Sequence, residues 1–162
     1  MEFEAMALPY RNFKKSQRRT YILIGDGFDE YEVVYFLHRF RQQGLPIKSV
    51  SLFNKLVFSR QGVGIKADYA LADQPFDPSC DCMLVLPSGG RNGERLRRDA
   101  RVKSLLQAFN SGHGRIALTD GGSELAADVE EVMTERPTLF RQNNERLEDF
   151  VESLADSMVY AV

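Results

Sequence analysis

The segment YILIGDG, residues 21–27, indicates the fold class of this chain. Four apolar residues followed directly by a glycine are typical of a β-strand that is buried on both faces of a parallel sheet. Residues 29–43 then place apolar side chains at helical spacing, and Gly44 follows them. Because glycine commonly ends helices, we expect a helix over this range, directly after the strand.

The same alternation of strand and helix patterns continues along the chain. We expect further strands at residues 47–53, 83–86 and 116–119, a hairpin at 57–71, and helices at 102–109, 123–133 and 147–158. Short apolar strands that alternate with helices form a parallel sheet with helices on both faces. The predicted fold class is therefore α/β, a three-layer α/β/α sandwich with a flavodoxin-like, mostly parallel sheet.

The composition is that of a single folded domain. The chain has 162 residues, of which 43% are hydrophobic and 27% are charged, and this excludes global disorder and a disulfide-rich scaffold. The net charge of −2 argues against a dedicated nucleic-acid-binding protein. No stretch approaches 18 uncharged apolar residues, so we expect no membrane-spanning helix and no membrane partner.

The N-terminal residues differ in charge from the rest of the chain. Residues 1–19 are basic, and we interpret them as a tail that precedes a single domain at residues 20–162. The tail is either a solvated leader or a contact for the acidic surface of a protein partner.

The chain has two cysteines, Cys80 and Cys82. They are separated by one residue, and we expect no disulfide between them. A reducing cytoplasm is then the simplest compartment for the protein.

Three polar, glycine-containing loops follow the predicted strands, at residues 25–32, 87–93 and 120–123. In open parallel sheets, ligands bind in the crevice beyond the carboxyl ends of the strands. Because these loops leave those ends, we expect them to form the walls of a site.

The order and spacing of these loops resemble those of a known family. The first loop reads GDGFDEYE at residues 25–32, the second LPSGGRNGERL at 86–96 and the third IALTDGGS at 116–123, and the hairpin contains GVGIKAD at 62–68. Together these motifs resemble the ThiJ/PfpI family, also called the DJ-one superfamily, which has the class I glutamine-amidotransferase-like fold. The likeness runs from about residue 21 to about residue 127.

The resemblance implies a catalytic arrangement at these loops. Active members carry a cysteine nucleophile on a sharp strand-to-helix turn, a glutamate from the first loop that holds the thiolate, and backbone amides that stabilise an oxyanion. Glu32 matches the glutamate, and Asp120 falls where the cysteine should be. The positions that match the ligand-binding or oxyanion-binding backbone are Ser88, Gly89, Gly121 and Gly122. We expect Arg91 at the mouth of the crevice, where it would hold an anionic ligand.

The aspartate at position 120 removes the cysteine chemistry of the family, which needs a thiolate at that turn. Cys80 and Cys82 precede the strand at 83–86 and are expected at the opposite end of the sheet. His38 and His113 are not placed to serve Asp120. Active members also continue further past this turn, so we expect this chain to have a shortened C-terminal part.

Two functions follow from this interpretation. The first is a pseudoenzyme, a non-catalytic binding, regulatory or assembly module that is dimeric like its relatives and needs no cofactor or metal. The second is a hydrolase or lyase that acts on a small carbonyl or amide compound through Asp120 and Glu32, whose carboxyls could share a proton. Asp120 could instead simply cap the helix that follows it.

Overall fold

The computed structural model describes residues 19–73, 82–112, 114–133 and 139–160. The predicted tail at residues 1–19 lies outside this part of the chain, except for Arg19, which begins the first strand. Cys80 and His113 also lie outside the described residues.

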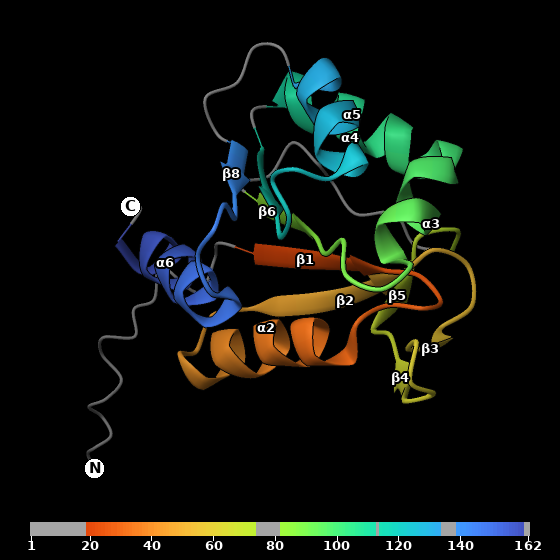
Figure 1. Cartoon of the computed structure of the whole chain (residues 1–162), viewed down its shortest axis with the longest axis horizontal. Helices are drawn as coiled ribbons and strands as arrows, with labels where there is room; N and C mark the ends of the chain where they lie inside the picture. The colour runs from red at the N-terminus through yellow and green to blue at the C-terminus, as the bar shows by residue number, and fades with distance from the viewer. Residues whose placement is uncertain (1–18, 74–81, 113, 134–138, 161–162) are drawn as a thin grey trace.

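A six-stranded parallel sheet forms the centre of the molecule (Figure 1). Its strands run in the order β5-β2-β1-β6-β7-β8, and every neighbouring pair is parallel. The bounds are β1 Arg19–Ile24, β2 Ile47–Ser51, β5 Tyr69–Ala70, β6 Cys82–Leu86, β7 Arg115–Leu118 and β8 Leu139–Arg141. Strand β6 is buried along its whole length, and β1 is buried after its first residue. Helices on both faces therefore explain why these strands are continuous apolar runs in the sequence.

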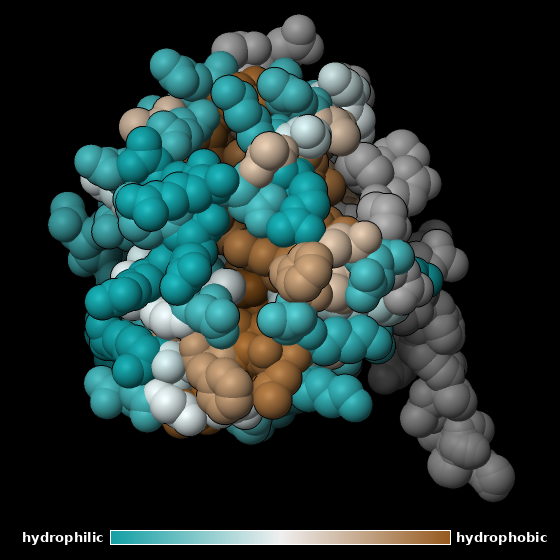
Figure 2. Space-filling model, turned by 90° about the vertical axis from the view of Figure 1, so that its right-hand side faces the viewer, coloured by the Kyte–Doolittle hydropathy of each residue, from teal (hydrophilic) through white to brown (hydrophobic). Residues whose placement is uncertain are grey.

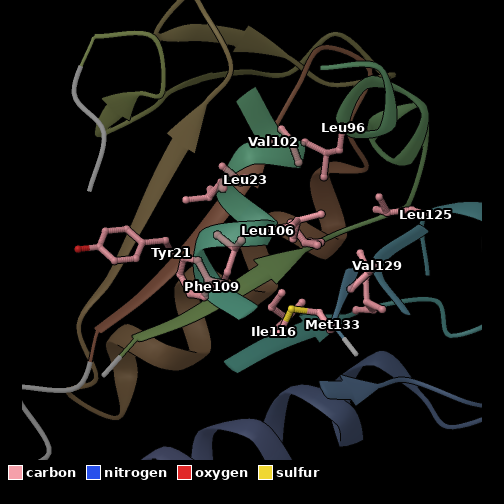
Figure 3. Packing of buried hydrophobic residues seen from close by; sticks show 14 of the residues in the cluster. Tyr21, Leu23, Leu96, Val102, Leu106, Phe109, Ile116, Leu125, Val129 and Met133 are labelled. Carbon is pink, nitrogen blue, oxygen red and sulfur yellow. The ribbon is translucent and has the colours of Figure 1, made fainter. Parts of the chain in front are cut away.

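Two layers of helices cover the sheet, which confirms the predicted α/β sandwich. On one face lie α3 (Asn92–Arg98), α4 (Ala100–Gly112) and α5 (Glu124–Val132), and on the other α2 (Glu30–Gln42) and α6 (Leu147–Tyr160). Successive side chains of β1 enter opposite cores: Leu23 packs under α3 and α4, and Ile22 packs under α2 and α6. Figure 3 shows the first of these cores, where Phe109 and Val129 meet the strands. Each fully buried large apolar side chain stabilises the fold by about 1.5–3 kcal/mol.

A separate antiparallel hairpin, β3 (Leu56–Phe58) and β4 (Gly64–Lys66), lies beside the sheet. It is shorter than the predicted hairpin at 57–71, because Tyr69 and Ala70 leave it and pair with β2 as strand β5. The strand predicted at 47–53 ends at Ser51, and residues 52–54 belong to the connection that follows it. Helix α3 has no counterpart among the predicted elements.

Cys82 begins β6 at the amino end of the strand, the end of the sheet where it was expected, and is fully buried. It is also disulfide-bonded, so the expectation that the cysteines form no disulfide is wrong for this residue. None of the described helices has the length and apolar character needed to cross a membrane.

Candidate functional site

Glu32 lies in the first turn of α2 and is 9% exposed. The helix begins after Asp29, whose carboxylate caps it by accepting a 3.0 Å hydrogen bond from the amide of Tyr31. The carboxyl of Glu32 reaches the loop after β6, where its Oε1 accepts a hydrogen bond from the amide of Gly89 at 3.0 Å. The cap of α2 therefore places a buried carboxyl against the second of the three predicted loops.

Burial raises the pKa of Glu32 above its usual value, because the carboxylate form loses its hydration. The hydroxyl of Thr119 and the amide of Gly89 oppose this rise in pKa, since both donate hydrogen bonds to the carboxylate. The negative charges of Asp29 and Asp120 raise the pKa further. Glu32 therefore retains its proton to a higher pH than an exposed glutamate does.

Thr119 connects this carboxyl to the end of β7, and the sequence analysis did not single it out. Its Oγ1 accepts a hydrogen bond from the amide of Ser88 at 2.9 Å and lies 3.2 Å from the hydroxyl of Ser88. Thr119 is 5% exposed, so these bonds lie away from water. One threonine thus joins Glu32 of α2 to the loop after β6. Its signal in the sequence is a hydroxyl residue at the end of an otherwise apolar strand.

Asp120 follows Thr119 and is exposed. Its Oδ1 accepts a hydrogen bond from the amide of Gly122 at 3.0 Å, so its side chain folds back onto the turn that leads into α5. Ser123 caps that helix, as predicted, by accepting a hydrogen bond from the amide of Ala126 at 3.1 Å. Among the described non-glycine residues only Asn144 has a positive φ, so Asp120 carries no left-handed backbone strain. No hydrogen bond between the carboxyls of Asp120 and Glu32 occurs in the described part of the chain.

The four backbone amides at the predicted ligand positions all donate to acceptors of the protein. The amide of Ser88 bonds to Thr119 and that of Gly89 to Glu32. The amide of Gly121 donates to the carbonyl of Gln142 at 3.0 Å, and that of Gly122 to Asp120. All four backbone N–H groups are therefore already hydrogen-bonded to other groups of the protein.

Two acidic residues of the first loop, Asp26 and Asp29, have separate structural partners. Asp26 accepts a hydrogen bond from the amide of Phe58 in the hairpin at 3.1 Å. Asp29 caps α2 and forms an ion pair with Arg60 at 3.4 Å. Within the described ranges, no group of three or more histidine, cysteine or acidic side chains is arranged to hold a metal ion.

Arg91 lies apart from this cluster, in a groove of about 660 Å³. The groove runs between the end of β1, the residues after β2, the start of β3 and the helices α3 and α4. Neither Glu32 nor Asp120 lines it. The residues predicted to form one site are thus divided between a closed polar cluster and an open groove.

Asn92 holds the wall of this groove in place, and sequence reasoning missed it. Its side chain is fully buried and accepts a hydrogen bond from the amide of Gly25 at 2.5 Å. Its Nδ2 donates to the carbonyls of Leu23 at 3.1 Å and Pro87 at 2.6 Å. A single amide side chain therefore ties the start of α3 to the carboxyl ends of β1 and β6.

Comparisons with known proteins relate the chain to one family. The model of the DJ-1/PfpI family matches residues 18–160. Two similar curated proteins are named deglycases: one from Thermococcus kodakarensis is 31% identical over 89 residues, and one from Pyrococcus abyssi is 30% identical over 93 residues. These matches cover 55% and 57% of this chain and 52% and 54% of the relatives. The chain thus spans about half the length of these curated relatives.

Similar folds occur among solved structures. Oxidised DJ-1 of Toxoplasma gondii superposes with a TM-score of 0.69 at 15% identity, over 88% of this chain and 90% of that one. DJ-1beta of Drosophila melanogaster gives a TM-score of 0.67 at 18% identity, also over 88% of this chain and 90% of that one. At such low identity, the likeness establishes the α/β fold alone.

Proposed function

This chain belongs to the DJ-1/PfpI family, and we propose that it acts as a binding, regulatory or assembly module without the cysteine chemistry of that family. The observation that carries the proposal is the engagement of the amides of Ser88, Gly89, Gly121 and Gly122 by acceptors of the protein itself. An oxyanion intermediate needs donors that are aimed at it and free to bind it. These four donors would have to break existing hydrogen bonds first.

Asp120, two residues after the end of β7, supports the same conclusion. From the motifs we expect Asp120 at the position of the family's nucleophile, and a carboxylate cannot replace a thiolate in that chemistry. Its carboxylate is hydrogen-bonded to Gly122 and exposed to solvent. A carboxylate that is hydrogen-bonded and solvated is a weak nucleophile.

The names of the two archaeal relatives supply the activity against which the proposal is tested. The wild-type chain, Asp120→Ala and Glu32→Gln are incubated with an amine glycated by methylglyoxal, and release of the free amine is measured. The Thermococcus relative that is named a deglycase serves as the positive control. We expect all three forms of this chain to match the rate in buffer. Release by the wild type that both substitutions reduce would overturn the proposal.

A second candidate function has one observation in its favour. Burial raises the pKa of Glu32, and Asp120 lies close enough to contribute to this rise; a carboxyl with a raised pKa is suited to general acid–base catalysis. This candidate is a hydrolase or lyase for a small carbonyl or amide compound. It requires that Asp120→Asn and Glu32→Gln each abolish turnover of such a compound while the fold persists.

We propose further that the chain forms a homodimer through apolar side chains near the hairpin. Tyr31 and Val34 on α2 are 55% and 47% exposed, and Phe58 of β3 is 49% exposed. The ion pair between Asp29 and Arg60 holds the hairpin beside the start of α2. Burial of these side chains against a second copy would remove them from water.

Sedimentation velocity tests this dimer. Val34→Glu is expected to give monomers, whereas Lys103→Glu, at an exposed position of α4 in the other helix layer, is expected to leave the dimer intact. A wild-type chain that sediments as a monomer would contradict the proposal.

A further inference from the structure

The groove beside α3 has the size of a small-molecule site. Its volume of about 660 Å³ falls within the range of roughly 300–1,000 Å³ that is usual for ligand pockets. Figure 2 shows the side of the molecule on which α3 and the hairpin lie, where hydrophobic side chains form a band between hydrophilic ones. Both apolar and charged residues line the groove.

Four arginines line the groove, and two of them are already paired. Arg101 forms a two-pronged ion pair with Asp99, with distances of 3.0 and 2.7 Å. Arg98 lies 3.5 Å from Glu94. The third acidic residue of the lining, Asp26, accepts a hydrogen bond from the hairpin. All three carboxylates of the groove therefore have partners on the protein.

The other two arginines, Arg91 and Arg95, have no carboxylate partner within the described residues. They lie four positions apart at the start of α3, where side chains at that spacing share a helix face. The planar guanidinium group of arginine can donate two parallel hydrogen bonds to the oxygens of a phosphate or carboxylate group. Two uncompensated guanidinium groups on one wall of a groove therefore attract an anion.

The opposite side of the groove is apolar. Leu52, Phe53 and Leu56 line it, and Phe53 is 66% exposed. The guanidinium carbon of Arg101 lies 5.9 Å from the centre of the Phe53 ring, which holds the ring at the groove by a cation–π contact. An apolar body that lies here would cover side chains that now face water.

The arginine wall is held in position by the backbone beneath it. A side chain at Gly25 would place its Cβ 3.0 Å from the Cβ of Arg95, and one at Gly27 would lie 2.8 Å from the Cβ of Arg91. Asn92, between the two arginines, is fully buried and fixes the helix to the sheet. The groove is thus largely formed before any ligand enters, which lowers the entropic cost of binding.

We propose that this groove binds a small organic anion. Arg91 and Arg95 hold its phosphate or carboxylate group, and Leu52, Phe53 and Leu56 contact its apolar body. The site is independent of whether the chain is catalytic, because Glu32 and Asp120 lie outside it.

The test is a titration of the ¹⁵N-labelled chain of residues 1–162, followed by amide chemical shifts. The probes are phenyl phosphate, phenylacetate, inorganic phosphate and benzyl alcohol. We expect saturable shifts at residues 52–57 and 91–95 with one or both aromatic anions. Binding of the anion to Arg91→Gln/Arg95→Gln should be weaker by roughly tenfold or more, because hydrogen bonds to charged groups are lost. Lys103→Gln, a basic-residue control on α4 outside the groove lining, should bind like the wild type.

Phe53→Ala tests the apolar wall separately. Because Phe53 is exposed, we expect this variant to fold like the wild type. It should weaken the aromatic anion and leave inorganic phosphate unchanged. Binding by phenyl phosphate alone would identify a phosphate ester as the ligand class, and binding by phenylacetate alone would identify a carboxylate. The proposal is overturned if neither aromatic anion gives saturable shifts at these residues. It is also overturned if the double arginine variant binds as the wild type does, or if benzyl alcohol binds as tightly as the anions.

Discussion

The carboxyl of Glu32 accepts a 3.0 Å hydrogen bond from the amide of Gly89, which lies 57 positions further along the chain. This contact joins the first turn of α2 to the loop after β6, and Thr119 adds the end of β7 to the same network. Three loops that are distant in sequence thus meet through one buried carboxyl. The network engages the amides of Ser88 and Gly89, so its properties can be tested residue by residue.

The first prediction concerns the pH dependence of stability. The pKa of Glu32 is raised in the folded protein, so the folded state binds its proton more tightly than the unfolded state does. The contribution of Glu32 to stability is therefore fully present below its usual pKa of 4.5 and is lost as the pH rises through the raised value. Glu32→Gln should remove this dependence.

The measurement is urea unfolding of the wild type and Glu32→Gln at a series of pH values from 4 to 8. The free energy of unfolding of the wild type minus that of the variant should decrease as the pH rises. This difference cancels the contributions of the other carboxylates. A difference that increases with pH would show that hydrogen bonds, and not burial, dominate at Glu32.

The second prediction concerns the close approach of the backbone at Gly89. A Cβ at this position would lie 2.8 Å from both the Cβ of Asp29 and the Oε1 of Glu32. Gly89→Ala should therefore lower the free energy of unfolding by about 1–3 kcal/mol. Gly122→Ala is the matched control, because the nearest atom to its Cβ, Asp120 Oδ1, lies 3.7 Å away. Equal stability of the two variants in chemical denaturation would refute this steric account.

The third prediction tests the hydroxyl of Thr119. Thr119→Val keeps the shape of the side chain but leaves the amide of Ser88 and the carboxyl of Glu32 without this partner. We expect a loss of about 1–3 kcal/mol in the free energy of unfolding. Thr119→Ser restores the hydroxyl and should recover much of that loss. If Thr119→Ser destabilises the protein more than Thr119→Val does, the methyl group and not the hydroxyl is what the fold needs.

The fourth prediction concerns the buried amide of Asn92. Asn92→Ala removes one acceptor and two donors from the ends of β1 and β6, and should cost about 3 kcal/mol of stability. Hydrogen exchange of the backbone amides in α3 should accelerate more than that in α5, because Asn92 belongs to α3 and its hydrogen bonds do not involve α5. Asn54→Ala, at an exposed position of the same groove, is the control. Uniform acceleration in both helices would contradict a local anchoring role.

The layers of the fold could be predicted because their signals are local. The runs at residues 21–24 and 83–86 are apolar throughout, and such runs indicate strands buried on both faces. The N-cap at Ser123 has an equally local pattern. By contrast, β5 is a strand of only two residues, and it exists because it pairs with β2. The local sequence around residues 69–70 carries no signal for that long-range pairing.

The site could be predicted only in part, for the same physical reason. Glu32, Ser88 and Gly89 were found through motifs, and they do lie together. Thr119 and Asn92 are single polar residues in or beside apolar segments, and their roles arise from partners on other strands. The groove forms where residues 52–57 meet α3, some forty positions away, so no local pattern reveals it.

The central claim is that the amides at the predicted oxyanion positions are already bonded within the protein. Hydrogen exchange of the amides of Gly89 and Gly121, followed by NMR under native conditions, tests this most directly. The hydrogen bonds to Glu32 and Gln142 predict exchange at least about tenfold slower than in an unstructured chain. Exchange of both amides at the unstructured rate would mean that the donors are free, and would contradict the account of a site closed to substrate.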